Sequence, residues 1–93
     1  MFLKPLARPI RGAFETFGAV YGVLDVKGTV LYVGRTDSLK RRIDEHLADR
    51  GHCMHRHGAA FVVQEWIATE SARQQREREL YDEYQPPCND IRP

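Results

Sequence analysis

The chain has few of the features that mark secreted or membrane proteins. No apolar run approaches the roughly 20 residues that a bilayer-spanning helix needs. The first five residues, MFLKP, lack the apolar stretch of a secretory signal, so we expect a cytoplasmic protein. Cysteine is scarce, and disulfides are rare in that compartment, so we expect Cys53 and Cys88 to stay reduced.

The chain also lacks a strong net charge, since its formal charge is +1 at neutral pH. The charge is nevertheless uneven: residues 1–42 hold eight Lys/Arg and three Asp/Glu, whereas residues 51–93 hold five and seven. A basic first half fits a phosphate-binding surface on one side of the molecule, and ordinary solvated faces are the alternative. With 93 residues and 42% hydrophobic content, the chain is long enough for one small folded domain.

Two β-rich runs with a short turn between them predict an antiparallel hairpin. The runs are residues 19–26 and 30–35, and Lys27 and Gly28 form the turn. Gly22 inside the first run indicates a bulge or a close approach of other groups. Gly34 ends the second run, where we expect it to permit a sharp entry into the next segment.

The segment after the hairpin has the pattern of an amphipathic helix over residues 39–48. Its apolar stripe recurs at every fourth residue, and Asp37 or Ser38 is placed to cap it. Arg42 and His46 are four residues apart and share one edge beside this stripe. Lys40 and Arg41 are expected to point outward, towards solvent.

The remainder of the chain completes an α+β pattern. Residues 51–58 hold three histidines and a cysteine, but the spacing matches no closed zinc pattern, so we expect a polar loop. A third strand is predicted over residues 59–67. A second helix follows, starting at Thr69 or Ser71 and ending near Tyr84 before two prolines. The predicted fold is a small three-stranded sheet flanked by helices, with residues 1–16 as an irregular lead-in arm and residues 17–93 as the domain.

Five short motifs in this order resemble the GIY-YIG nucleases. The first two motifs correspond to residues 19–21, Ala-Val-Tyr, and residues 32–34, Tyr-Val-Gly. The family's helical arginine and histidine match Arg42 and His46. Its later glutamate and asparagine match Glu77 and Asn89, and the resemblance covers roughly residues 18–90.

The resemblance implies a metal-dependent DNA endonuclease with a one-metal mechanism. Glu77 would bind Mg²⁺ or Mn²⁺, because one carboxylate suffices for an ion that keeps waters and takes substrate oxygens. Its helical neighbour Arg73 offers an ion pair as the alternative role for this carboxylate. Arg42 would clamp the scissile phosphate. Tyr21 and His46 both remain candidates for the general base.

Other residues receive supporting roles. Tyr32 would hydrogen-bond the phosphate or the attacking water, and Gly34 and Asn89 would support the structure. Three basic residues would add affinity for the DNA backbone: Arg35, Lys40 and Arg41. The substrate stays open among branched, nicked, damaged or sequence-specific DNA and RNA, with roles in repair, recombination, mobile elements or restriction. The alternatives are a DNA-structure-binding module without activity, or a nuclease that needs a partner protein or self-association.

Overall fold

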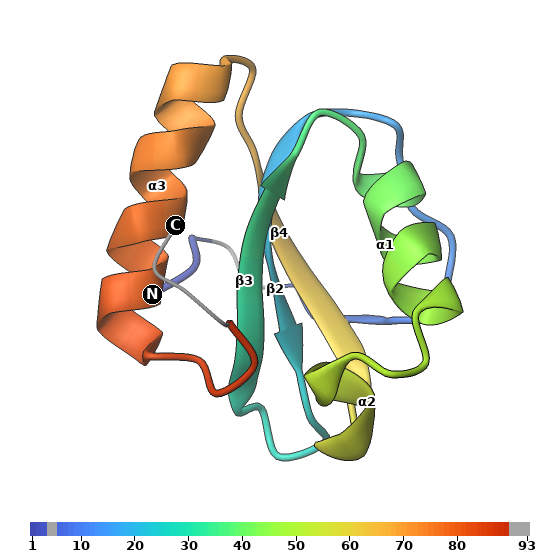
Figure 1. The fold of residues 1–93 in the computed structure, drawn as a ribbon. Coiled ribbons are helices and arrows are strands. Elements are labelled where there is room, and N and C mark those ends of the chain that lie inside the picture. Colours follow the sequence, from blue (N-terminus) through green and yellow to red (C-terminus); the bar gives the residue numbers. More distant parts are fainter. Residues whose placement is uncertain (4–5, 90–93) are drawn as a thin grey trace.

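The computed structural model describes residues 1–3 and 6–89, and it has an α+β fold (Figure 1). A four-stranded antiparallel sheet has the order β1-β4-β2-β3. The strands are β1 (Arg8–Pro9), β2 (Ala19–Leu24), β3 (Val30–Thr36) and β4 (Phe61–Trp66). The helices are α1 (Leu39–Ala48), α2 (Cys53–Arg56) and α3 (Glu70–Tyr84).

The strand count is larger than the sequence indicated, because the expected irregular arm contributes β1. Arg8 and Pro9 pair with Val62 and Phe61 of β4. Ile10, which follows β1, is buried in the core together with residues of β2 and α1. The prediction of three strands was therefore wrong, and burial of one apolar side chain explains why this short segment is held against the sheet.

The predicted hairpin is present, and its turn shortens the first strand. The side-chain oxygen Oδ1 of Asp25 accepts hydrogen bonds from the backbone N–H groups of Lys27 and Thr29, each at 2.9 Å. Gly28 has φ +85°, a conformation that suits glycine. β2 consequently ends at Leu24 and not near residue 26 as predicted.

The two longer helices lie on opposite sides of the sheet, as Figure 1 shows. On the side that we call the α1 face, Tyr21 and Val23 pack with Leu39 and Ile43 of α1. On the other side, the α3 face, Leu80 of α3 joins an apolar cluster with side chains from β2, β3 and β4. Successive strand residues point to opposite faces, so this division follows the alternation along β2, where Val20 lies on the α3 face and Tyr21 on the α1 face.

Capping fixes where these helices begin and end. The Ser38 side chain accepts from the N–H of Arg41 at the start of α1, whose bounds match the prediction. Thr69 caps α3 by accepting from Ala72, so the alternative start at Ser71 was wrong. Gln85 takes the left-handed conformation after α3, and two prolines follow it.

Residues 51–58 are more ordered than the polar loop that we expected. They contain the short helix α2, whose residue Met54 is completely buried. Cys53 at the start of this helix forms a disulfide with Cys88, with their Cα atoms 5.4 Å apart. The expectation that both cysteines are reduced is thus contradicted, because the fold brings together two residues that are 35 positions apart.

No helix within the described ranges, 1–3 and 6–89, has the length and apolar character needed to cross a bilayer.

Candidate active site

Tyr21 and Gly34 fit together across the hairpin. The two residues are direct partners in the β2–β3 register. A Cβ atom added to Gly34 would lie 2.6 Å from the Tyr21 hydroxyl oxygen and 2.7 Å from its Cζ. Gly34 lies inside β3 and does not end it, so our expectation of a sharp turn there was wrong. Its lack of a side chain gives the Tyr21 ring the space in which it packs.

Tyr21 forms a short hydrogen bond with His46 of α1. The hydroxyl oxygen lies 2.6 Å from His46 Nε2, and the two residues are 0% and 2% exposed. The ring of Tyr32, from β3, lies 6.1 Å from the Tyr21 ring and 5.1 Å from the His46 ring, measured between centroids. The structure therefore gathers three of the predicted site residues on the α1 face.

A second histidine, for which the sequence indicated no role, belongs to this group. The ring of His52 lies 5.3 Å from that of Tyr32 and 5.4 Å from that of His46, edge to face in both cases. Its Nδ1 accepts from the backbone N–H of Met54 at the start of α2, which orients the ring. We call Tyr21, Tyr32, His46 and His52 the tyrosine–histidine cluster.

Burial keeps the hydrogen-bonded pair of this cluster uncharged. Burial raises the pKa of Tyr21 well above its usual value, nearby Tyr32 adds to this, and the Arg42 charge opposes it. Burial also lowers the pKa of His46 to about 3, with further contributions from the charges of Arg42, His52 and His55. At neutral pH a phenol thus faces a neutral imidazole, and the tautomer of His46 decides whether the Tyr21 hydroxyl or the His46 Nε2–H donates the hydrogen bond.

Arg42 borders the cluster, and acidic neighbours balance the basic residues of α1. Arg42 is half-buried beside Tyr21 and Tyr32, and its guanidinium also donates to Glu45 at 3.0 Å. Lys40 and Arg41 are exposed, as predicted, and each forms an ion pair with an acid four residues away. Exposed pairs of this kind contribute little free energy, so a phosphate can compete with the carboxylates for these cations.

Glu77 lies on the opposite side of the sheet, the α3 face. Its side chain is 8% exposed, and its Oε1 accepts from Nη1 of Arg35 in β3. Arg35 also donates to Glu70 in the first turn of α3. Arg73, the partner that the sequence suggested for Glu77, instead donates to Glu70 and to two backbone carbonyls. The structure thus places Glu77 and Arg35 together on the α3 face. Tyr32 and Arg42 lie on the α1 face.

The carboxylates on the α3 face have the chemistry to hold a hard divalent cation. Burial raises the pKa of Glu77, and its hydrogen bond with Arg35 opposes that rise. Glu77 and Glu70 both bind the guanidinium of Arg35, so the two carboxylates converge on one position. Oxygen donors are what Mg²⁺ prefers, and one carboxylate with waters and phosphate oxygens completes its shell. The residues present therefore fit the metal that the resemblance implies.

Asn89 holds the outer edge of β3. Its Oδ1 accepts from the N–H of Val33, and its Nδ2 donates to the Val33 carbonyl, each at 2.9 Å. The N–H of Cys88 donates to the Leu31 carbonyl at 2.9 Å. The segment after α3 therefore fixes the strand that carries Tyr32 and Arg35.

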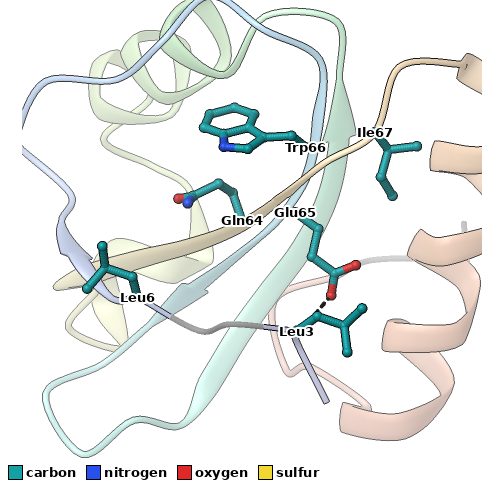
Figure 2. A pocket seen from close by; sticks show the side chains of 6 residues that line it. All are labelled: Leu3, Leu6, Gln64, Glu65, Trp66 and Ile67. Atoms are coloured by element: carbon teal, nitrogen blue, oxygen red, sulfur yellow. Dashed lines mark hydrogen bonds between the residues drawn. The ribbon is translucent and has the colours of Figure 1, made fainter.

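The apolar pocket in Figure 2 contains no residue of the tyrosine–histidine cluster and none of the group around Glu77. It is lined by Leu3, Leu6, Gln64, Glu65, Trp66 and Ile67. Half of this lining comes from β4, which β2 separates from β3 in the sheet. The pocket has no titratable pair of the kind that the cluster has, because its carboxylate, Glu65, is bound by Arg76.

The fold and the cluster together define a small α+β domain that gathers tyrosine, histidine and arginine side chains on one sheet face. A family model described as the GIY-YIG catalytic domain matches residues 17–91, and the chain belongs to this family of nucleases. A comparison with curated proteins finds no match to the chain.

Proposed function

We propose that this chain is a divalent-metal-dependent endonuclease that hydrolyses phosphodiester bonds in DNA. The observation that carries the proposal is the buried Tyr21–His46 hydrogen bond, held beside Arg42 and Tyr32. Phosphodiester hydrolysis needs a group that takes a proton from water and a cation that stabilises the phosphate. The cluster and the adjacent Arg42 offer these two groups within one small region.

Arg42 and Tyr32 are the groups that first meet the substrate. Both are partly exposed, whereas Tyr21 and His46 are buried. The guanidinium of Arg42 binds two oxygens of the scissile phosphate, since its planar donors match that geometry. The hydroxyl of Tyr32 hydrogen-bonds the phosphate or the attacking water.

Tyr21 and His46 form the route by which the proton of the water leaves. As Tyr21 takes this proton, its own passes to the neutral His46 Nε2 along the 2.6 Å hydrogen bond. The positive charge of Arg42 is one of the causes that lower the pKa of His46. A bound phosphate compensates this charge, so substrate binding raises the basicity of the imidazole when it is needed.

On the α3 face, Glu77 would hold the metal ion, with Glu70 and Arg35 around it. Mg²⁺ or Mn²⁺ bound there supplies positive charge that stabilises the phosphate and the leaving oxygen. Lys40 and Arg41 add affinity for the DNA backbone, and this contribution falls with rising salt concentration.

Cleavage of labelled plain, nicked and branched duplex DNA tests the proposal, with Mg²⁺ present and with EDTA as control. We expect Arg42→Ala and Glu77→Gln each to lower the cleavage rate about 100-fold or more while DNA binding persists. Arg50→Ala and Glu79→Gln are the matched controls, because both residues are exposed and lie on or directly after the same helices. These two variants should cleave at the rate of the wild type.

Binding of these DNAs without cleavage of any would overturn the proposal in favour of a structure-binding module. Single-stranded RNA of matched sequence is tested in parallel, and cleavage of RNA alone would overturn the assignment to DNA. Equal cleavage by Glu77→Gln and wild type would refute the metal-holding role of this carboxylate.

A further inference from the structure

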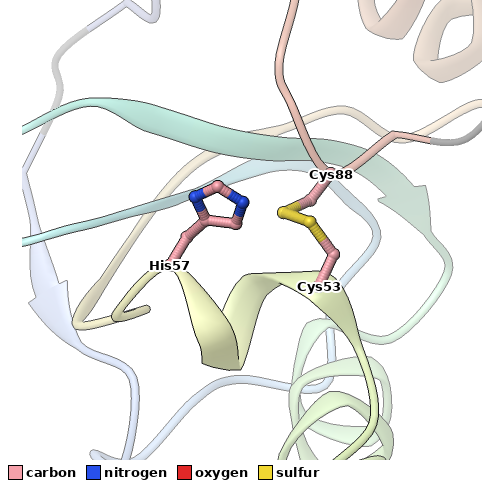
Figure 3. Close-up of side chains that lie close together, drawn as sticks. All are labelled: Cys53, His57 and Cys88. Atoms are coloured by element: carbon pink, nitrogen blue, oxygen red, sulfur yellow. A yellow bond between two sulfur atoms is a disulfide. The ribbon is translucent and has the colours of Figure 1, made fainter.

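Cys53, His57 and Cys88 come together at the end of the sheet that lies beside α2, as Figure 3 shows. Their possible ligand atoms all lie within 4.8 Å of one another. Cys53 begins α2, and His57 follows its last residue, donating its backbone N–H to the Cys53 carbonyl. Cys88 is 3% exposed, Cys53 is half-buried and His57 is exposed, so the group opens to solvent on one side.

The donor set differs from that around Glu77. Two sulfurs and an imidazole are soft and borderline ligands, which suit Zn²⁺ and not Mg²⁺. Three protein ligands with a fourth position open to water are an established zinc arrangement. The histidine-rich segment alone did not indicate this site, because its third ligand, Cys88, is distant in the sequence.

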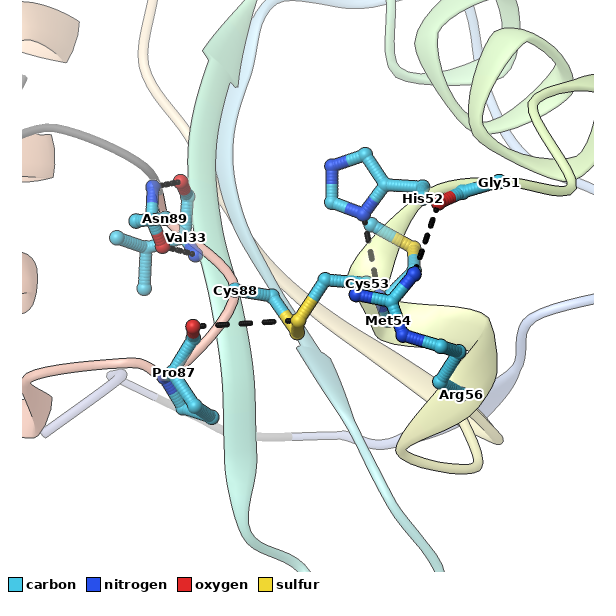
Figure 4. The surroundings of a disulfide bond; sticks show 9 residues. All are labelled: Val33, Gly51, His52, Cys53, Met54, Arg56, Pro87, Cys88 and Asn89. Atoms are coloured by element: carbon cyan, nitrogen blue, oxygen red, sulfur yellow. Dashed lines mark hydrogen bonds between the residues drawn. A yellow bond between two sulfur atoms is a disulfide. The ribbon is translucent and has the colours of Figure 1, made fainter.

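The protein holds these ligands in place by contacts other than the disulfide. Cys88 is held through its own N–H to Leu31 and through its neighbour Asn89, which pairs with Val33 (Figure 4). α2 is held through buried Met54 and through His55, whose Nε2 donates to the His46 carbonyl at 2.7 Å. Cleaving the S–S bond therefore leaves both sulfurs close together.

The change in spacing that a metal requires is small. Two thiolates about 2.3 Å from a tetrahedral zinc ion lie about 3.8 Å apart. This separation is within the 4.8 Å that already encloses the three ligand atoms. The Cα atoms of the two cysteines are 5.4 Å apart, so their side chains start from neighbouring positions.

We propose that the reduced protein binds one Zn²⁺ through Cys53, His57 and Cys88, and that disulfide formation and zinc binding exclude each other. A dithiol reductant donates two electrons and two protons to the Cys53–Cys88 bond and is itself oxidised to a disulfide. Zinc then replaces the two thiol protons, which pass to solvent. Reducing conditions would therefore favour the zinc form, and oxidising conditions would favour the disulfide form. The proposal does not depend on the nuclease assignment.

Metal titration of the reduced protein tests the proposed zinc site. The protein is reduced with dithiothreitol, freed of reductant without oxygen and titrated with Co²⁺, a spectroscopic substitute for zinc, and then with Zn²⁺. We expect one equivalent of Co²⁺ to give thiolate-to-metal absorption, and one equivalent of Zn²⁺ to abolish it. The oxidised protein should show no such absorption. Millimolar Mg²⁺ should leave the absorption of the cobalt-loaded reduced protein unchanged.

Variants define the ligands. Cys53→Ser and Cys88→Ser should lose the thiolate spectrum of the wild type, and His57→Ala should bind Zn²⁺ at least about tenfold more weakly. Arg56→Ala is the matched control, because it removes an exposed side chain directly beside His57 that lies outside the group, and its zinc affinity should not fall below that of the wild type. Equal zinc affinity of His57→Ala and wild type would overturn the three-ligand site.

A second measurement separates loss of a ligand from loss of the fold. Zinc that binds the folded form raises the melting temperature of the reduced wild type, and it slows alkylation of both cysteines by iodoacetamide. A melting temperature that falls on adding zinc would overturn the proposal, because it shows that the ion prefers the unfolded chain. Reduced wild type that melts cooperatively but gives no thiolate–cobalt absorption would also overturn it.

Discussion

His46 should make the protein less stable in mild acid. Its imidazole is 2% exposed and its pKa is lowered to about 3, chiefly by burial. The groups around it are Tyr21 and Tyr32 from the sheet, Arg42 from its own helix, and His52 and His55 at and within α2. In the unfolded chain this imidazole titrates near pH 6.5. Between pH 6.5 and about 3 the unfolded state therefore binds a proton that the folded state does not.

The size of this effect follows from the two pKa values. The stability that the unprotonated His46 provides is fully present above pH 6.5 and is lost as the pH falls below it. One pKa unit corresponds to about 1.36 kcal/mol, so lowering the pH from 7.5 to 5 should cost about 2 kcal/mol of the free energy of unfolding. For a small domain this is a large share of a total of about 5–15 kcal/mol.

Urea denaturation of wild type and His46→Gln at pH 7.5 and pH 5 measures this loss of unfolding free energy. The variant lacks the titrating group, so its free energy of unfolding should fall by about 2 kcal/mol less than that of the wild type over this pH range. The carboxylates titrate in both proteins, and the difference between the proteins therefore isolates His46. His57→Gln, at an exposed histidine, should behave as the wild type. The same pH dependence in wild type and His46→Gln would refute the reasoning.

Two further predictions concern the supports of β3. Gly34→Ala should lower the free energy of unfolding by about 1–3 kcal/mol, because the new methyl group would lie 2.6 Å from the Tyr21 hydroxyl of a fully buried ring. Thermal unfolding measures this, with Gly51→Ala as the control, and equal losses in the two variants would contradict the packing argument. Asn89→Ala should cost about 1–2 kcal/mol by removing two hydrogen bonds to Val33. Faster amide exchange at Val33 is the accompanying signal, and an unchanged exchange rate would argue against the role of Asn89.

The hairpin and the two long helices could be predicted from the sequence because local patterns determine them. The bounds of α1 match the apolar stripe at Leu39 and Ile43, which pack on the sheet as the stripe predicts. β1 could not be predicted, since two residues have no periodicity and its pairing partner lies more than 50 residues away. The disulfide was also missed, because its formation depends on the path of the chain between Cys53 and Cys88.

The site was predicted in part, and strand alternation explains the remainder. The short motifs identified Tyr21, Tyr32 and His46, which the structure brings together. His52 was missed because its position depends on a four-residue helix that gives no pattern in the sequence. Arg35 is three positions after Tyr32, an odd separation, so the two side chains point to opposite faces of a strand. The odd separation in the sequence is therefore sufficient to predict that Tyr32 and Arg35 lie on different faces, although our sequence-based prediction placed them at one site.

The position of β3 explains how residues on two faces of a sheet can serve one reaction. β3 is the outer strand, and Tyr32 and Arg35 on it face α1 and α3 respectively. A phosphate backbone that lies along an outer strand can be contacted from both faces, whereas one beside an inner strand meets only one. Asn89 and Cys88 bind the outer backbone groups of this strand at Val33 and Leu31. The segment that carries Cys88 therefore also limits the path that a nucleic-acid backbone can take along β3. The proposed zinc site and the proposed nuclease site are thus connected through this strand.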